Sequence, residues 1–258
     1  MSIAISAADL TLKLPIHARW TSPAPGTTGM QEVGGRLEQK DSTHAFIRAL
    51  DGVSFEIKRG QRVGLIGHNG AGKTSLLKVL AGIYPPTQGK VIVQGRISTL
   101  FSSAIGFNVE ATGYENIMLM GVLLGFGKKA ILDLAPEIAD FSELGQFLDM
   151  PLRTYSAGMR TRLGFAIATS IRPDCLLIDE VMGAGDARFQ RKAKERITTM
   201  MQSAYTLILA SHSLNSIHQF CDSALWLDHG KLRGFGPIRE IVGRFKEENK
   251  KRRPAPAS

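Results

Sequence analysis

The sequence predicts an α/β fold in which helices flank a mostly parallel sheet, together with an antiparallel β edge and an α-helical subdomain. Two continuous apolar runs, 176–178 and 206–210, are typical of parallel strands that are buried on both faces of a sheet. The charged segment 187–202 between them has the pattern of a helix. From about residue 98 to 170, apolar residues recur at helical spacings, which predicts the α-helical subdomain.

Further strands are expected outside these buried runs. Residues 3–14 alternate loosely between apolar and polar side chains, as an edge strand does, and strand character returns over 46–57. Residues 224–227 and 231–233 flank Asp228-His229-Gly230, which is a typical hairpin sequence. We expect such strands to supply the antiparallel edge.

The length of 258 residues predicts one large domain over about 1–245, which includes the helical subdomain. A long insert at about 15–45 is rich in proline, glycine and polar residues, and the sequence leaves open whether it is functional or disordered. The basic segment 246–258 is expected to be a disordered tail. The net charge of +9 suits a nucleic acid, an acidic membrane surface or an anionic ligand, and equally a generally basic soluble protein.

Other bulk features exclude several classes of protein. The 2 cysteines form neither a disulfide framework nor a zinc pattern. The N-terminus lacks a charged region followed by an apolar stretch, so no signal peptide is expected. No segment approaches the roughly 18 uninterrupted apolar residues of a spanning helix. We therefore expect a cytoplasmic chain that would need a separate partner to work at a membrane.

A complete phosphate-binding motif, G-x-x-x-x-G-K-[ST], lies between the strand-like run 62–66 and a helical segment opened by Ser75. Its residues are Gly67, His68, Asn69, Gly70, Ala71, Gly72, Lys73 and Thr74. Glycines let backbone N–H groups approach phosphate oxygens, and the helix N-terminus adds its positive dipole end. Lys73 is expected to reach the β and γ phosphates, and the Thr74 hydroxyl to ligate Mg²⁺. The motif predicts a P-loop NTPase core whose nucleotide site includes Ser75.

The apolar run 175–178 ends in two adjacent carboxylates, Asp179 and Glu180. Asp179 is expected to hold Mg²⁺ opposite Thr74, directly or through water. Glu180 is expected to polarise the attacking water, as a general base or as a water-positioning group. Neighbouring side chains diverge at a strand end, so one carboxylate can face the metal while the other faces the γ-phosphate. Downstream of a phosphate loop, this pair favours an ATPase over two solvated acids.

A second anion-binding end is predicted where Ser156 caps a helix that runs to about residue 170. The Ser156 hydroxyl, the unhindered Gly158 backbone and the first-turn N–H groups would form it. His212 follows the strand 206–210, where a histidine can meet a γ-phosphate as donor and sensor. Taken alone, both features are more often structural, and their positions along the chain favour the functional interpretation.

Along the chain, the phosphate loop is followed by the segment 155–159, then by the carboxylate strand and then by His212. This order resembles that of the ATP-binding subunits of ABC transporters, and the resemblance covers nearly the whole chain, about residues 1–245. It implies that 155–159 is the signature loop, which contacts ATP bound on the opposite subunit of a head-to-tail homodimer. The segment 181–186, which contains Asp186, resembles the family's loop that crosses this dimer interface. His212 resembles the family's switch histidine. Catalysis would then depend on Glu180, His212 and Lys73.

Several positions depart from the usual family pattern. Tyr155 and Met159 stand where the signature usually has leucine and glutamine, and Ala157 replaces a glycine. The family's glutamine loop has no glutamine between residues 97 and 110, so the group that replaces it is not identified. The family also stacks an aromatic side chain on adenine near the first strand, and the sequence leaves three candidates: His17, Trp20 and Phe46.

These departures resemble the branch of ATPases that export polysaccharide, including O-antigen, capsule and teichoic acid exporters. Segments 110–117, 141–145 and 149–151 are similar to that branch, and the long insert fits the O-antigen type best. The resemblance implies a homodimer that hydrolyses ATP with Mg²⁺ and binds a separate integral-membrane permease at the cytoplasmic face of the inner membrane. The permease would handle most of the glycolipid, and no nucleic acid is expected. Two alternatives stay open: an ATPase of another transporter class, and a soluble ABC ATPase that acts on nucleic acid or ribosomes.

Overall fold

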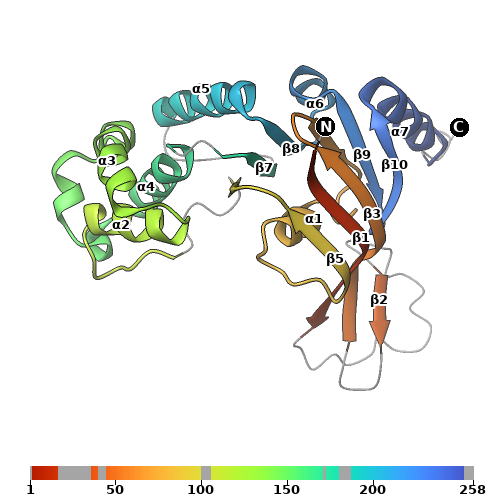
Figure 1. Cartoon of the computed structure of the whole chain (residues 1–258), viewed down its shortest axis with the longest axis horizontal. Helices are drawn as coiled ribbons and strands as arrows, with labels where there is room; N and C mark the ends of the chain where they lie inside the picture. The colour runs from red at the N-terminus through yellow and green to blue at the C-terminus, as the bar shows by residue number, and fades with distance from the viewer. Residues whose placement is uncertain are drawn as a thin grey trace, which may run out of the picture. The chain divides into compact units, whose positions relative to one another are not determined.

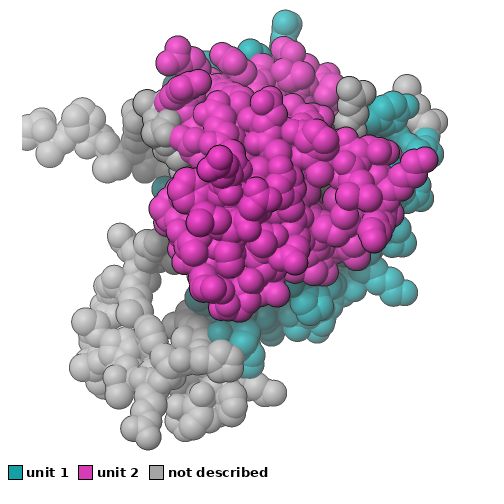
Figure 2. Space-filling view, turned by 90° about the vertical axis from the view of Figure 1, so that its left-hand side faces the viewer, with its two compact units in different colours: residues 1–96, 177–180, 205–258 teal, residues 97–176, 181–204 magenta. Residues whose placement is uncertain are grey.

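The computed structural model describes residues 2–16, 36–39, 45–99, 106–170, 173–179 and 187–252. The chain divides into two compact units, which Figure 2 shows in different colours. Unit 1 comprises residues 1–96, 177–180 and 205–258, and unit 2 comprises residues 97–176 and 181–204. No helix in the described ranges is both long and apolar enough to cross a bilayer.

An antiparallel sheet in unit 1 has the strand order β2-β3-β1-β5 (Figure 1). Its strands are β1 (Ile3–Ile16), β2 (Arg36–Gln39), β3 (Ala45–Lys58) and β5 (Gln88–Val93). The strands β1 and β3 pair along their length, with Ile5 opposite Ile57 and both side chains fully buried. The strand β2 lies within the predicted insert and pairs with the start of β3, so part of that insert is regular structure. Residues 17–35 and 40–44 of the insert lie outside the described ranges.

A second, mixed sheet has the order β10-β9-β4-β8-β7-β6. Its strands are β4 (Arg62–Ile66), β6 (Ile97–Thr99), β7 (Cys175–Asp179), β8 (Thr206–Ala210), β9 (Ser223–Asp228) and β10 (Lys231–Pro237). The strand β4 pairs in parallel with both β8 and β9, whereas β9 and β10 form the antiparallel hairpin that the sequence predicts. Residues 175–178 of β7 and every residue of β8 are buried, as expected for the two continuous apolar runs. The predicted α/β class is confirmed.

The described part of unit 1 contains the helices α1 (Lys73–Leu80), α6 (Leu214–Phe220) and α7 (Ile238–Arg252). The helix α7 packs against β9 and β10 (Figure 1). In this contact the Phe245 ring meets the Trp226 ring edge to face. Because α7 extends to Arg252, the expectation of a disordered tail from residue 246 is wrong for residues 246–252. Burial of Ile241 and Val242 on one side lets the basic residues of the helix stay on its exposed side. Residues 253–258 lie outside the described ranges.

Unit 2 contains the helices α2 (Gly113–Leu123), α3 (Lys128–Ser142), α4 (Ala157–Thr169) and α5 (Ala187–Ser203). Two short 3₁₀ turns, η1 (Gly145–Asp149) and η2 (Leu152–Thr154), connect α3 to α4. The helix α2 begins with a capping box, in which the Thr112 and Glu115 side chains accept from each other's backbone N–H groups. Three buried rings from α3, α4 and α5, those of Phe141, Phe165 and Phe189, contact one another and form the aromatic centre of this unit.

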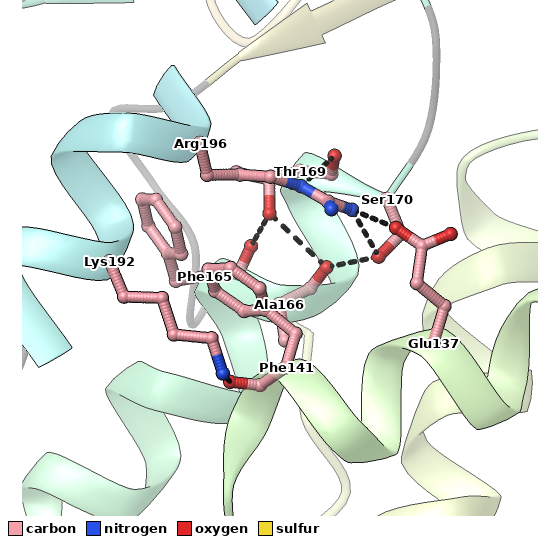
Figure 3. Close-up of polar contacts among 8 residues, drawn as sticks. All are labelled: Glu137, Phe141, Phe165, Ala166, Thr169, Ser170, Lys192 and Arg196. Carbon is pink, nitrogen blue, oxygen red and sulfur yellow. Dashed lines mark hydrogen bonds and ion pairs between the residues drawn. The ribbon is translucent and has the colours of Figure 1, made fainter. Parts of the chain in front are cut away.

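Two cations of α5 fasten this helix to α3 and α4 (Figure 3). The Lys192 ammonium lies 4.7 Å from the centre of the Phe141 ring, and the Arg196 guanidinium lies 5.1 Å from it. Arg196 also donates to the Thr169 carbonyl at 3.3 Å and pairs with Glu137. Such contacts stabilise the packing of α5 on α3 and α4. They therefore position the helix that follows segment 180–186, where Glu180 and Asp186 are found in the sequence.

Candidate functional site

The phosphate-binding loop connects the buried strand β4 to α1. The Lys73 side chain is only 8% exposed, and its ammonium donates to the carbonyl of Gly67 at 2.8 Å and to that of His68 at 2.9 Å. Lys73 is the first residue of α1, and its side chain reaches back across the loop to these two carbonyls. Its ammonium is thus close to the backbone that would surround a phosphate. Thr74 is exposed and Ser75 is half-buried, next to Lys73 in the same turn.

Glycine is required at two positions of this loop. Gly72 has φ of +103°, and a Cβ there would lie 2.7 Å from the Ala49 carbonyl oxygen. At Gly67 a Cβ would lie 2.3 Å from the Leu227 carbonyl oxygen. Gly72 also stands at the N-cap of α1, so no side chain caps this helix. Its first-turn N–H groups and positive dipole end are therefore suited to an anion, which fits the triphosphate that the motif predicts.

Parallel pairing brings the ends of several strands to one edge of the mixed sheet. Leu65 of β4 lies opposite Ala210 of β8, and Ile66 of β4 lies opposite Trp226 of β9. The loop after β4, the exposed His212 after β8 and the end of β9 consequently lie at the same edge. In open α/β sheets, ligands bind at the carboxyl ends of the strands.

Asp179 is the half-buried last residue of β7, which is next to β8 in the strand order. The phosphate loop, His212 and Asp179 therefore follow three strands that are consecutive in the sheet, β4, β8 and β7. Carboxylate and hydroxyl oxygens are ligands that Mg²⁺ prefers, so the donor types of Asp179 and Thr74 fit that ion.

Other predicted site residues lie outside the described ranges. They are Glu180, Asp186, the segment 101–105 within the glutamine-loop region, and the aromatic candidates His17 and Trp20. The third candidate, Phe46, is half-buried in β3 opposite Pro15. The roles assigned to all of these residues stay predictions.

The predicted signature loop lies in unit 2, at the start of α4. Ser156 is the N-cap of this helix, and its hydroxyl accepts a hydrogen bond from the Met159 N–H at 3.2 Å. Ser156 and Gly158 are both exposed, and a Cβ at Gly158 would meet nothing closer than Ser156 Oγ at 3.8 Å. The first turn of α4 is thus sterically open, as an anion-binding end requires.

Tyr155, which departs from the family pattern, is a buried anchor for this loop. Its side chain is 4% exposed, and its hydroxyl donates to the Phe147 carbonyl at 2.5 Å. The two rings also meet edge to face, with centroids 6.4 Å apart. Burial raises the pKa of the Tyr155 phenol to about 12. Tyr155, which directly precedes Ser156, is therefore anchored to η1 by both packing and a hydrogen bond.

One polar residue near the phosphate loop was not predicted as functional. Asp228 ends β9 and is only 1% exposed, yet its carboxylate lies 3.0 Å from the His68 ring and 3.1 Å from the Arg233 guanidinium. The sequence indicates only a hairpin at 228–230. The sequence does place this aspartate at the end of an otherwise apolar run. Such a position indicates a buried carboxylate, which needs charged or hydrogen-bonding partners.

A known protein family matches the part of the chain that contains most of these motifs. A family model described as ABC transporter matches residues 50–183, a segment that contains the phosphate loop, the predicted signature loop and Asp179. The chain belongs to the ABC transporter family. This ABC protein is 43% identical over 224 residues to the O-antigen export system ATP-binding protein RfbE of Yersinia enterocolitica, which is 87% of this chain and 94% of that protein.

Two further relatives are longer than this ABC protein. It is 40% identical to the O-antigen export system ATP-binding protein RfbB of Myxococcus xanthus, over 83% of this chain and 48% of that protein. It is 41% identical to the teichoic acids export ATP-binding protein TagH of Bacillus anthracis, over 83% of this chain and 39% of that protein. The predicted resemblance to the polysaccharide-export branch is confirmed, and the chain is an ATPase of the ABC transporter type.

Solved structures agree on the fold. The ATP-binding subunit of an ABC transporter gives a TM-score of 0.66 at 21% identity, covering 94% of this chain and 93% of that one. A dimeric ATP-binding cassette bound to ADP and Pi in a post-hydrolysis state gives 0.61 at 18% identity, covering 91% of this chain and 99% of that one. At these identities the likeness supports the ABC ATPase fold.

Proposed function

We propose that this ATPase drives the export of a lipid-linked polysaccharide, either O-antigen and lipopolysaccharide or a capsule or teichoic acid, across the inner membrane. The observation that carries the proposal is the 43% identity to an O-antigen export ATP-binding protein over 94% of that protein's length. The teichoic acids export relative, at 41% identity, supports the same branch and leaves the glycan open.

The proposed catalytic roles follow from the loop and the strand ends. Lys73, already a donor to two loop carbonyls, would bind the β and γ phosphates. Thr74 and Asp179 would hold Mg²⁺, which the donor types at these positions favour. His212 would donate to the γ-phosphate, and Glu180 would position or activate the attacking water. Catalysis of this kind depends on positioning and on charge stabilisation.

We also propose that two copies bind ATP between them, head to tail. The exposed first turn of α4, with Ser156 at its N-cap and Gly158 unobstructed, would contact the nucleotide held by the phosphate loop of the other copy. Asp186 would lie at the interface between the copies. Binding of ATP would favour the closed dimer, and hydrolysis followed by product release would favour the open one.

The remaining part of the proposal is a separate integral-membrane permease, bound at the cytoplasmic face of the inner membrane. Its support is the naming of the relatives as export-system ATP-binding proteins, since an ATP-binding protein of such a system works with a transport pathway. Choice of the glycolipid would then reside mainly in the permease.

Substitution Glu180→Gln tests the catalytic part. It should retain ATP binding, trap an ATP-bound dimer visible by size-exclusion chromatography, and lower the hydrolysis rate at least a hundredfold, because one charged catalytic group contributes on the order of 3 kcal/mol or more. Glu195→Gln, a change of an exposed glutamate on α5, is the matched control and should hydrolyse ATP normally. Wild-type turnover by Glu180→Gln would refute the assignment.

Deletion of the gene in its native host tests the export part. Lipid-linked glycan should accumulate inside the cell, and export should return with the wild-type gene and fail to return with Glu180→Gln. A polytopic membrane protein should copurify with the chain after mild detergent extraction. Copurification of ribosomal material or nucleic acid, with normal glycan export in the deletion strain, would refute the transport proposal and favour the soluble alternative.

A further inference from the structure

Two histidines and one aspartate meet where the β9–β10 turn touches the phosphate loop. The Nε2 atom of His68 lies 3.0 Å from Asp228 Oδ1, and the Nε2 atom of His229 lies 3.8 Å from the same oxygen. The two imidazole rings are 4.5 Å apart between centroids, and the three donor atoms all lie within 4.8 Å of one another. The cluster thus combines residues that are about 160 positions apart in the chain.

The fold itself holds these residues in place. Parallel pairing of β4 with β9 sets Ile66 opposite Trp226, so His68 and Asp228 each follow by two residues along adjacent strands. The Gly230 N–H donates to the Ala71 carbonyl at 3.0 Å, which fastens the turn to the phosphate loop. His229 adopts a left-handed backbone with φ of +47°, and this conformation is part of the same turn. The donor atoms therefore converge through main-chain geometry.

The hydrogen bonding of His68 suits a metal ligand. Its Nδ1 lies 2.6 Å from the Asn69 carbonyl oxygen, so in a neutral ring Nδ1 carries the proton and Nε2 offers a lone pair. That Nε2 is buried and makes no hydrogen bond of good geometry with the described residues, although Asp228 Oδ1 lies 3.0 Å from it. Metal-bound histidines commonly donate their other ring N–H to a backbone carbonyl. An electron-pair acceptor bound to Nε2 would satisfy this buried nitrogen.

Asp228 is arranged in a matching way. Its Oδ2 accepts from Arg233 Nε at 3.2 Å and lies 3.1 Å from Arg233 Nη2, whereas Oδ1 faces the two histidines. A ligating carboxylate is usually hydrogen-bonded through its other oxygen, and Arg233 is that partner. The carboxylate is 1% exposed while the histidine side chains are 30% and 34% exposed, so an ion can reach the site past the rings.

The geometry points to a transition-metal site formed by His68 Nε2, Asp228 Oδ1 and His229 Nε2, and Zn²⁺ is the ion that fits it. Zinc lies about 2.0–2.2 Å from imidazole and carboxylate ligands in tetrahedral sites, which places neighbouring donors roughly 3.3 Å apart. The 3.0 and 3.8 Å separations bracket that value. Two imidazoles also disfavour Mg²⁺, which prefers oxygen ligands. The site is therefore separate from the Mg²⁺ site proposed at Thr74 and Asp179.

Metal binding here would couple to the nucleotide site. The backbone carbonyl of His68 accepts from Lys73, while its ring would bind the metal. A bound Zn²⁺ would join the phosphate loop to the β9–β10 turn and restrict the movement of the loop that carries Lys73. Metal binding at this cluster requires no transported substrate.

Calorimetric titration of the full-length chain with Zn²⁺, in the absence of nucleotide, tests the site. Wild type should bind one Zn²⁺ per chain, and His229→Asn should weaken that affinity more than about tenfold, because even indirect partners of a metal ligand contribute 10- to 100-fold. Asparagine tolerates the left-handed backbone at this position, so the variant removes the imidazole at little cost to the turn. His218→Asn removes an exposed histidine of α6 outside the cluster and should bind Zn²⁺ like wild type.

Substitution of Co²⁺ for Zn²⁺ gives an independent measurement. Wild type and His218→Asn should show the intense visible absorption of four-coordinate Co²⁺, and His229→Asn should lose it. His68→Asn, tested with the same two methods, decides the matter if His229→Asn does not fold by circular dichroism. Equal Zn²⁺ affinity in wild type and in the cluster variant, or an equal loss in His218→Asn, would overturn the proposal.

Discussion

Tyr155→Phe isolates one hydrogen bond that anchors the predicted signature loop, residues 155–159. The change removes the hydroxyl that donates to the Phe147 carbonyl at 2.5 Å and keeps the ring, so the edge-to-face contact with the Phe147 ring remains. The carbonyl still accepts from the Met150 N–H at 2.9 Å and is not left without a donor. The loss should therefore be that of one net hydrogen bond, about 1 kcal/mol, and not the larger penalty of an orphaned buried group.

The same substitution has a signature in pH. Because burial raises the folded-state pKa of Tyr155 to about 12, the fold favours the neutral phenol. The contribution of the neutral Tyr155 phenol to the free energy of unfolding is complete below the unfolded-state pKa of about 10. This contribution is lost as pH rises toward the folded-state pKa. Phenylalanine does not ionise, so the difference in unfolding free energy between wild type and Tyr155→Phe should narrow above about pH 10.

Urea denaturation followed by circular dichroism measures this difference. Since the chain has two compact units, each transition is fitted separately, and the shift in midpoint at constant slope reports the change. Tyr114→Phe, at a tyrosine 45% exposed on α2, is the control and should change stability by less than about 0.5 kcal/mol. The reasoning fails if Tyr155→Phe is as stable as this control, or if its difference from wild type stays constant up to pH 11.

Lys73→Ala should lower ATP hydrolysis at least a hundredfold, which a phosphate-release assay at saturating ATP would show, and unchanged turnover would contradict its role. Arg196→Ala should cost about 1–3 kcal/mol by urea denaturation, since it removes an α4 hydrogen bond and a cation–ring contact, whereas Lys194→Ala on the exposed side of α5 should be near neutral. Burial raises the pKa of the Cys175 and Cys221 thiols to about 12, so at pH 8 neither should react with a thiol reagent until the protein is unfolded, and rapid reaction in the folded state would count against this.

Motifs made of consecutive residues could be predicted from the sequence because their geometry is local. The turn of the phosphate loop depends on glycines within a few residues of Lys73, and the Ser156 cap depends on a backbone N–H three residues away. Continuous apolar runs likewise indicated the buried strands β7 and β8. The family followed from the order of these motifs.

Contacts between distant segments needed the tertiary structure. The sequence alone could not bring Asp228 to His68, because that contact depends on which strands are neighbours and on their register. Nor could it show that Tyr155 is buried against η1, or that α7 continues to Arg252 on a buried apolar side. The sequence by itself determined the nucleotide-binding chemistry and the family, since both reside in local motifs. Only the tertiary structure decided which side chains surround those motifs, since strand order and register are properties of the whole fold.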